Sequence, residues 1–203
     1  MRRRRPRRPH PLRDDRSRQR ARARRRPQRR HDRGGDALSE GGESAAPGPA
    51  DLEVRRAGPS DAGTVGLLLF DFNTEFVTPT PAAAVLAARF ERLLEREDVV
   101  VLLAREGGED IGFAYLTYRP TPYGDGPLVQ LEELYVRPAL RDEGVGAALL
   151  GRALDDAVAA GAVELDINVD AVDIDTRRFY ERWGFSCVDP GTGDLMLCYV
   201  REL

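Results

Sequence analysis

A short segment with two glycines is the first part of the sequence whose residue types and spacing suggest chemistry. It reads Arg141-Asp142-Glu143-Gly144-Val145-Gly146 and separates a predicted strand from a predicted helix. Glycines at such a junction let backbone N–H groups turn toward one point at the helix N-terminus, which suits phosphate oxygens. The segment lacks the Lys-Ser/Thr pair of a P-loop and the third glycine of a dinucleotide fingerprint. We therefore expect a phosphate-bearing ligand here; the alternative is a helix start that is merely rich in glycine.

A second group of residues follows about thirty positions later and includes Phe179, Tyr180, Trp183, Gly184 and Phe185. Phe179 and Trp183 are four residues apart, so they lie on one face of a helix and are expected to pack inward. Gly184 is suited to end that helix in a left-handed conformation. Tyr180 then lies at the edge of the packed face, and taken alone it would be interpreted as a core aromatic residue.

The two motifs together resemble the GNAT superfamily, the acyl-CoA-dependent N-acetyltransferases. In that family Arg-x-x-Gly-x-Gly follows a strand ending in Tyr-Val-x-Pro, and a helix carrying Phe-Tyr comes later; this sequence has both between about 52 and 203. The resemblance implies that acetyl-CoA is the co-substrate and that Tyr180 protonates the leaving thiolate. It also implies a set of residues that hold acetyl-CoA through backbone groups and loop side chains: Leu134, Tyr135, Val136, Arg141, Asp142, Glu143, Gly144, Val145, Gly146, Ala147, Asp173 and Thr176.

Some positions depart from the family pattern. Asp173 stands where the family often has Asn, and it can still cap the helix. Thr176 stands where the family often has Ala, which is a small change. Asp142 and Glu143 occupy loop positions that usually favour Gly, basic or amide residues, so they would weaken pyrophosphate binding unless they point to water.

Two adjacent carboxylates, Glu132 and Glu133, precede the glycine loop. Adjacent residues of a strand point to opposite faces, so only one of the two is expected to face a reaction cleft. The resemblance implies that a carboxylate at Glu132 acts as general base, often through water. The alternative is that both are solvated charges at the cleft edge.

The expected acceptor site is also acidic. Asp71, Phe72, Glu75 and Phe76 lie in the segment predicted to join the first two helices, which in the family usually forms one wall of that site. Carboxylates beside aromatic rings suit a cation, through charge pairing and cation–π contact. With Glu133 added, these residues indicate a cationic primary amine, either small or at a peptide terminus; alternatively the charge serves only solubility.

The charge of the chain is strongly divided. Its net charge is -3, yet residues 1–33 hold 17 Arg and three Asp, and residues 34–203 carry a net -17. Residues 1–51 contain no aromatic or β-branched residue, so we predict a disordered Arg-rich tail and linker. One interpretation is that the tail binds nucleic acid or acts as a counterion to the acidic part of the chain. We favour the alternatives, a passive tail or a start site assigned too far upstream.

Several classes of protein are excluded by composition. No apolar run approaches the ~20 residues of a membrane span, and no secretory signal follows the basic N-terminus. His10 and His31 both lie in the tail, which excludes a Ser-His-Asp or Cys-His mechanism and a His-ligated metal in the folded part. Cys187 and Cys198 are too few for a disulfide scaffold. We expect a cytoplasmic protein without a metal, and a homodimer is one option.

The order of predicted elements defines the fold class. We expect an α+β (mixed α/β) domain over 52–203, with a twisted, mostly antiparallel mixed sheet of six to seven strands and about four helices on both faces. Helices are expected from Ser60 to about Phe72 and from Thr80 onward, each with that residue as N-cap, and over 144–160 and 174–183. Strands are expected over 52–57, 99–105, 111–119, 128–136 and 163–169, followed by a terminal hairpin of 185–189 and 195–201.

The sequence thus predicts an N-acetyltransferase that moves an acetyl group from acetyl-CoA to an amine by direct attack in a ternary complex. Two alternatives belong to other classes. One is a catalytically silent acyl-CoA-binding regulatory domain, and the other is a nucleic-acid-associated protein that acts through its Arg-rich tail.

Overall fold

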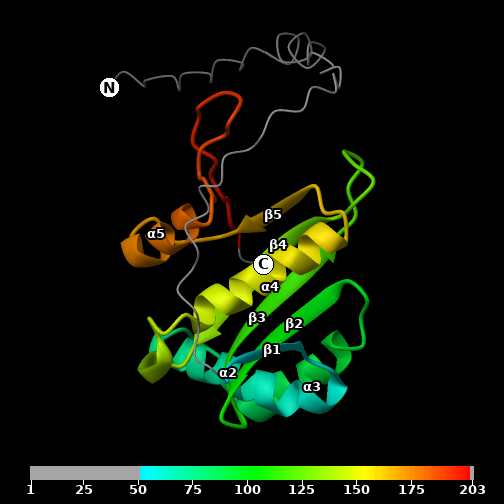
Figure 1. Ribbon diagram of the computed structural model, residues 1–203, viewed down its shortest axis with the longest axis vertical. Coiled ribbons are helices and arrows are strands. Elements are labelled where there is room, and N and C mark those ends of the chain that lie inside the picture. Colours follow the sequence, from blue (N-terminus) through cyan, green and yellow to red (C-terminus); the bar gives the residue numbers. More distant parts are fainter. Residues whose placement is uncertain (1–50, 202–203) are drawn as a thin grey trace, which may run out of the picture. The chain divides into compact units, whose positions relative to one another are not determined.

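The computed structural model describes residues 51–201 of the chain, so the predicted tail and linker lie, except for Asp51, outside the described residues. Four α-helices and five strands make up the described part (Figure 1). The strands are β1 (Glu53–Arg56), β2 (Val99–Glu106), β3 (Glu109–Arg119), β4 (Leu128–Val136) and β5 (Glu164–Ile167). The helices are α2 (Ala62–Glu75), α3 (Ala83–Leu93), α4 (Val145–Ala159) and α5 (Ile174–Arg182), with 3₁₀ turns η1 (Pro59–Asp61) and η2 (Pro138–Leu140).

The strands form one sheet in the order β1-β2-β3-β4-β5. The first four are antiparallel neighbours, whereas β5 runs parallel to β4, to which it is connected through α4. A parallel pair needs such a crossover, while the antiparallel pairs need only turns. The predicted α+β class, with a mixed and mostly antiparallel sheet, is confirmed.

The helices cover both faces of this sheet. The β2 segment from Val99 to Ala104 is buried along its whole length because successive residues point into different cores. Val101 belongs to the core under α2 and α3, while Leu102 belongs to the core under α4. α4 crosses one face of the sheet (Figure 1). Both layers are needed to hold β4, the strand that leads to the glycine loop.

Close packing between α2 and α3 sets the position of the C-terminal end of α2. A Cβ atom added to Gly66 would lie 2.5 Å from the backbone nitrogen of Ala87, so only glycine permits this approach of the two helices. On α3, Leu86 and Phe90 are buried, Leu93 is half-buried, and Val85 is exposed.

Both predicted N-caps differ from the structure. Ser60 is inside η1, and Asp61 caps this turn instead by accepting a hydrogen bond from the backbone nitrogen of Gly58 at 2.8 Å. Thr80 lies before α3, and its hydroxyl accepts a hydrogen bond from Asn73 Nδ2 at 3.3 Å. Thr80 therefore bonds to α2 rather than to the first turn of α3, and no side chain caps the start of α2 or α3 in the described structure.

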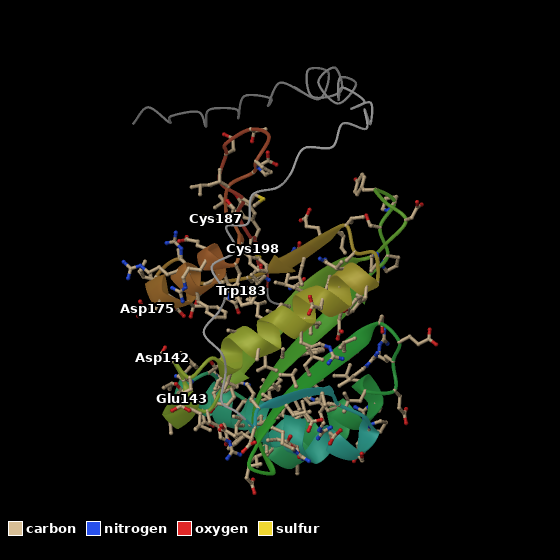
Figure 2. The ribbon with its side chains drawn as sticks, in the orientation of Figure 1. Asp142, Glu143, Asp175, Trp183, Cys187 and Cys198 are labelled. Carbon is tan, nitrogen blue, oxygen red and sulfur yellow. The ribbon has the colours of Figure 1, made fainter. Side chains whose placement is uncertain are left out.

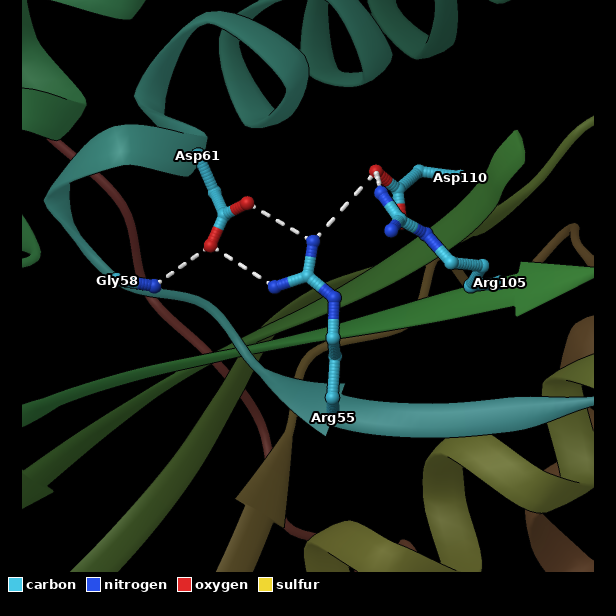
Figure 3. A network of polar contacts seen from close by, with 5 residues as sticks. All are labelled: Arg55, Gly58, Asp61, Arg105 and Asp110. Carbon is cyan, nitrogen blue, oxygen red and sulfur yellow. Dashed lines mark hydrogen bonds and ion pairs between the residues drawn. The ribbon is translucent and has the colours of Figure 1, made fainter. Parts of the chain in front are cut away.

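An ion-pair network ties β1 to η1 and to the β2–β3 hairpin (Figure 3). Arg55 donates to both carboxylate oxygens of Asp61 at 2.8 and 2.9 Å. Arg105 donates to Asp110 at 2.7 and 3.1 Å, and Arg55 lies 3.6 Å from the same carboxylate. The Arg55 guanidinium lowers the pKa of Asp61, although burial acts in the opposite direction. The network anchors the edge strand of the sheet.

The C-terminal hairpin differs from its prediction. Within residues 185–201 the structure has a single antiparallel bridge, Val188 with Leu195, in place of two strands. The described sheet therefore has five strands rather than six or seven. Leu195, Leu197 and Tyr199 are exposed, so this segment lacks the packing that would stabilise strands.

Candidate active site

The glycine loop leads directly into α4. Gly144 has φ +87°, a left-handed conformation that favours glycine, and the loop residue Asp142 is also left-handed, with φ +63°. No side chain caps the first turn of α4 in the described structure. The N–H groups of Val145, Gly146 and Ala147 are therefore among the first-turn donors without a helical partner, and they lie at the positive end of the helix dipole. This end of α4 can hold an anion.

The two acidic residues of the loop do not obstruct that end. Asp142 and Glu143 are both exposed, and their side chains project from the loop that precedes α4 (Figure 2). Water can screen their charges there, so these two carboxylates should weaken pyrophosphate binding less than their positions in the sequence suggest.

The second half of β4 has an open edge. Pairing between β4 and β5 ends at Leu131 and Ile167, while β4 continues to Val136. The N–H of Arg137 donates to Ile111 of β3 at 3.0 Å, and successive N–H groups of a strand point to opposite edges. The N–H groups of Leu134 and Val136 accordingly point to the open edge, where an extended ligand could bind.

A β-bulge interrupts β4 beside this edge. Leu116 of β3 pairs with Leu131, but the preceding residue, Tyr115, pairs with Glu133. Glu132 is therefore an extra residue with no cross-strand partner of its own. Such a bulge locally shifts the alternation of side chains.

The bulge places both glutamates toward the same face of the sheet. Leu131 and Leu134 pack in the core under α4 although they are three residues apart, while Tyr135 packs in the core under α2 and α3. The charges of Glu132 and Glu133 both raise the pKa of Tyr115, which shares that second core. The expectation that only one glutamate can face the cleft assumed strict alternation, which fails at this bulge.

The two glutamates have different surroundings. Glu132 is exposed and accepts hydrogen bonds from Thr117 Oγ1 at 2.6 Å and Gln130 Nε2 at 3.1 Å. Glu133 is half-buried, and burial together with the charge of Glu132 raises its pKa to about 7. A carboxyl group with that pKa can accept and release protons near neutral pH.

Tyr180 is fixed by the packing of α5. Its side chain is buried between Phe179 and Phe185, with ring centroids 5.1 and 5.5 Å away. Burial raises the pKa of Tyr180, and the negative charges of Glu133 and Asp173 add to the rise. The hydroxyl therefore stays protonated at neutral pH and remains a hydrogen-bond donor.

Small residues of α4 bring α5 close. Cβ atoms added to Gly146 and Gly151 would lie 3.9 Å from the ring of Phe179 and 3.4 Å from the ring of Trp183, respectively. The inward packing predicted for both aromatic residues is confirmed. Asp173 caps α5 as predicted, since its carboxylate accepts from the Thr176 N–H at 3.1 Å.

The predicted acceptor wall lies in the last turns of α2, not in the segment between the helices, because α2 extends to Glu75. Phe72 lies 5.4 Å from the Tyr135 ring and 5.2 Å from the Phe76 ring. The charges of Glu75 and Asp71 both raise the pKa of Tyr135, after the larger effect of burial. α2 thus brings this acidic and aromatic group to the C-terminal end of β4.

Two predicted site residues contact one another. Both terminal nitrogens of Arg141 donate to the Glu75 carboxylate at 2.7 Å, and Arg141 Nε donates to the Val136 carbonyl at 3.0 Å. The guanidinium carbon is 5.8 Å from the centre of the Tyr135 ring. The residue expected to bind phosphate and a residue expected to bind the amine are joined in an ion pair.

Sequence reasoning did not single out Arg137. Its Nε is buried and has no hydrogen-bond partner within residues 51–201. A buried donor left unpaired is costly, and a cation at the start of the loop is suited to an anionic ligand. In the sequence, Arg137 is recognisable only as an arginine between the end of a strand and a proline. A surface arginine without a ligand can occupy the same position.

Residues 51–201 contain no cluster of His, Cys, Asp and Glu that could hold a metal ion. None of the helices described is long and apolar enough to cross a membrane.

Comparison with known families decides what this arrangement belongs to. The model of the Acetyltransferase (GNAT) family matches residues 67–185, which include the open strand, the glycine loop and the Tyr180 helix. The chain belongs to the GNAT family. It is accordingly an N-acetyltransferase, and the resemblance inferred from the two motifs is confirmed.

Individual relatives agree with this GNAT assignment. An uncharacterized N-acetyltransferase of Bacillus subtilis, YhfO, is 30% identical over 147 residues, which cover 72% of this chain and 96% of that protein. The crystal structure of a predicted acetyltransferase from Arthrobacter sp. FB24 is 46% identical, with a TM-score of 0.70, and covers 78% of this chain and all of that one.

More distant structures share the GNAT fold alone. An aminoglycoside acetyltransferase from a soil metagenomic sample, crystallised with sisomicin, has a TM-score of 0.62 at 18% identity and covers 75% of this chain and 96% of that one. GNAT membership implies acetyl-CoA as the acetyl donor.

Proposed function

We propose that this GNAT enzyme acetylates a primary amine, preferably a cationic one, by direct attack on acetyl-CoA within a ternary complex. One observation carries the proposal: a half-buried glutamate with a pKa of about 7 shares the open end of β4 with an uncapped helix N-terminus and a protonated tyrosine. These are the groups that amine acetylation needs: a base, an anion receptor and an acid.

The residues present fit acetyl-CoA. The first-turn amides of α4 suit its pyrophosphate. The outward N–H groups of Leu134 and Val136 suit its pantetheine and acetyl carbonyls. Acetyl-CoA supplies the acetyl group as a thioester, whose carbonyl carbon an uncharged amine can attack.

Proton transfer is assigned to two side chains. An alkyl ammonium must lose a proton before it can attack, and Glu133 accepts that proton. As the C–N bond forms and the C–S bond breaks, the Tyr180 hydroxyl donates its proton to the departing sulfur. The second proton of the attacking nitrogen passes to water, and Tyr180 is reprotonated from solvent. Glu133 releases its proton to solvent before the next turnover. One ammonium and one thioester then give one amide, one thiol and one released proton.

The base is assigned to Glu133 rather than to Glu132, which was the expectation from the family. Glu132 is exposed and its two oxygens are already engaged by Thr117 and Gln130. Glu133 has the pKa of an effective base at neutral pH. The bulge supports this assignment, because it turns Glu133 to the same face as Glu132.

The preference for a cationic acceptor rests on Asp71 and Glu75, which flank Phe72 at the end of α2. A panel of amines assayed by release of CoA tests it directly. We expect cationic amines to react fastest, Asp71→Asn to raise KM for the best amine, and added salt to do the same. A preferred acceptor that is neutral or anionic would refute the cationic preference, whereas no CoA release with any amine would favour the silent acyl-CoA-binding alternative.

A further inference from the structure

The Arg141–Glu75 ion pair joins two segments that the proposed function assigns to different ligands. Arg141 belongs to the loop before α4, and Glu75 is the last residue of α2, 66 positions earlier in the sequence. Both contacts are 2.7 Å and together they are bidentate. With Arg141 Nε bonded to the Val136 carbonyl, every nitrogen of the guanidinium has a partner.

While Arg141 and Glu75 are paired with each other, neither side chain can bind a ligand with its full charge. A guanidinium offers carboxylates and phosphates the same pair of parallel N–H bonds, so a phosphate can use that pair fully only if Glu75 leaves it. Likewise, an ammonium gains the full charge of Glu75 only if Arg141 leaves. In the structure each charge is neutralised by the other.

We infer that the Arg141–Glu75 pair is an exchange contact between the two ligand sites: an acyl-CoA phosphate takes Arg141, and Glu75 is thereby released to bind the ammonium of the acceptor. This inference rests on the proposed function, because it assumes that both ligands bind at this end of β4. The ligand that binds first breaks the Arg141–Glu75 ion pair, so binding of the second ligand no longer includes the free-energy cost of breaking it. Binding of the two is therefore mutually favourable, and linkage requires the effect to be equal in both directions.

The size of the effect follows from exposure. The side chains of Arg141 and Glu75 are 38% and 28% exposed, so solvent screens their attraction. Ion pairs of that kind contribute little, and a coupling of about two- to five-fold in affinity is expected. The Arg141 guanidinium lies 5.8 Å from the centre of the Tyr135 ring, which packs against Phe72. The released Glu75 therefore stays near aromatic rings that favour a cation.

Calorimetry of CoA binding to the full chain tests the exchange without an acceptor. Glu75→Gln removes the competitor for Arg141, so we expect CoA to bind about two- to five-fold more tightly than to the wild type. Glu91→Gln is the matched control. It removes the same charge from an exposed position of α3, outside the loop and the acceptor residues, and Arg141 donates to Glu75 instead. Its CoA affinity should change less than that of Glu75→Gln.

Hydrogen exchange provides a second measurement. In the wild type, CoA should accelerate amide exchange in the last turn of α2, because that turn loses its contact with the loop. Unchanged or weaker CoA binding in Glu75→Gln, or equal gains in both variants, would overturn the exchange while leaving the proposed function intact. Absence of CoA binding in the wild type would instead refute the proposed function, and the exchange with it.

Discussion

Glu133 lies next to Glu132 on the same face of the sheet, although adjacent strand residues ordinarily face opposite ways. The bulge in β4 is the cause, because Tyr115 pairs with Glu133 and leaves Glu132 as an extra residue. The proximity of the Glu132 charge adds to burial in raising the pKa of Glu133 to about 7.

The first prediction concerns the pH dependence of the rate. A general base must be deprotonated, so kcat/KM should rise with pH and level off above an inflection at about 7, the pKa of Glu133. Glu133→Gln should lower kcat/KM by about 100-fold and remove the inflection. Glu132→Gln is the control, and it should shift the inflection downward because it removes a neighbouring negative charge. An inflection that survives in Glu133→Gln would assign the base to another group.

The second prediction concerns stability and the same carboxyl group. Its folded-state pKa of about 7 exceeds its ordinary value of 4.5, so the native state holds the proton more tightly. The contribution of Glu133 to the free energy of unfolding is therefore fully present below about pH 4.5, and it is lost as the pH rises through about 7. Urea unfolding should find Glu133→Gln more stable than the wild type at pH 8 and equal to it near pH 4. The opposite sign at pH 8 would show that ionised Glu133 has a stabilising partner.

The third prediction concerns the acid. Tyr180→Phe keeps the packing between Phe179 and Phe185 and removes only the hydroxyl. We expect kcat to fall about 10- to 100-fold while the dissociation constant of acetyl-CoA stays unchanged. The pKa of Tyr180 is raised, so its hydroxyl does not titrate at acid or neutral pH. The pH profile of the Tyr180→Phe variant should therefore have the same shape as that of the wild type in this range. Wild-type turnover would reduce Tyr180 to a packing residue.

The fourth prediction concerns the loop. A Cβ at Gly146 would meet Val136 and Phe179 at 3.8 and 3.9 Å, which is ordinary contact, so Gly146→Ala should fold and bind acetyl-CoA. Gly146→Asp adds a carboxylate in the first turn of α4 and should abolish binding by calorimetry, with a native circular dichroism spectrum. Unchanged binding by the Asp variant would exclude this turn as the phosphate site.

The fifth prediction concerns the edge strand. Asp61→Asn weakens the contact with Arg55 and should cost about 1 kcal/mol of unfolding free energy at pH 7, or about 2–4 °C in Tm. The pKa of Asp61 is lowered, so its contribution is present above its ordinary value of 3.8 and is lost as pH falls through the folded-state pKa. The difference between variant and wild type should therefore close near pH 2. A gap that persists there would mean that the Asn side chain strains η1.

The sequence by itself determined the family, the fold class and the residues of the two motifs. Gly144 meets a local requirement for a left-handed residue before a helix, and Phe179 and Trp183 meet one for inward packing at i, i+4. Such requirements depend on spacing along the chain, so they can be inferred without tertiary contacts. The predicted mixed sheet followed similarly from the order of the elements.

Tertiary structure alone decided which groups meet. The change in side-chain alternation at Glu132 arises from the pairing of β4 with β3. The sequence of β4 alone does not indicate it. The Arg141–Glu75 contact joins positions 66 residues apart, and it exists because α2 is packed against α3 and ends beside Tyr135. The raised pKa of Glu133 depends first on burial, which exists only in the folded chain. Register, burial and ion pairing are properties of the folded surroundings, which is why the motifs could locate the site but not assign its base or its internal contacts.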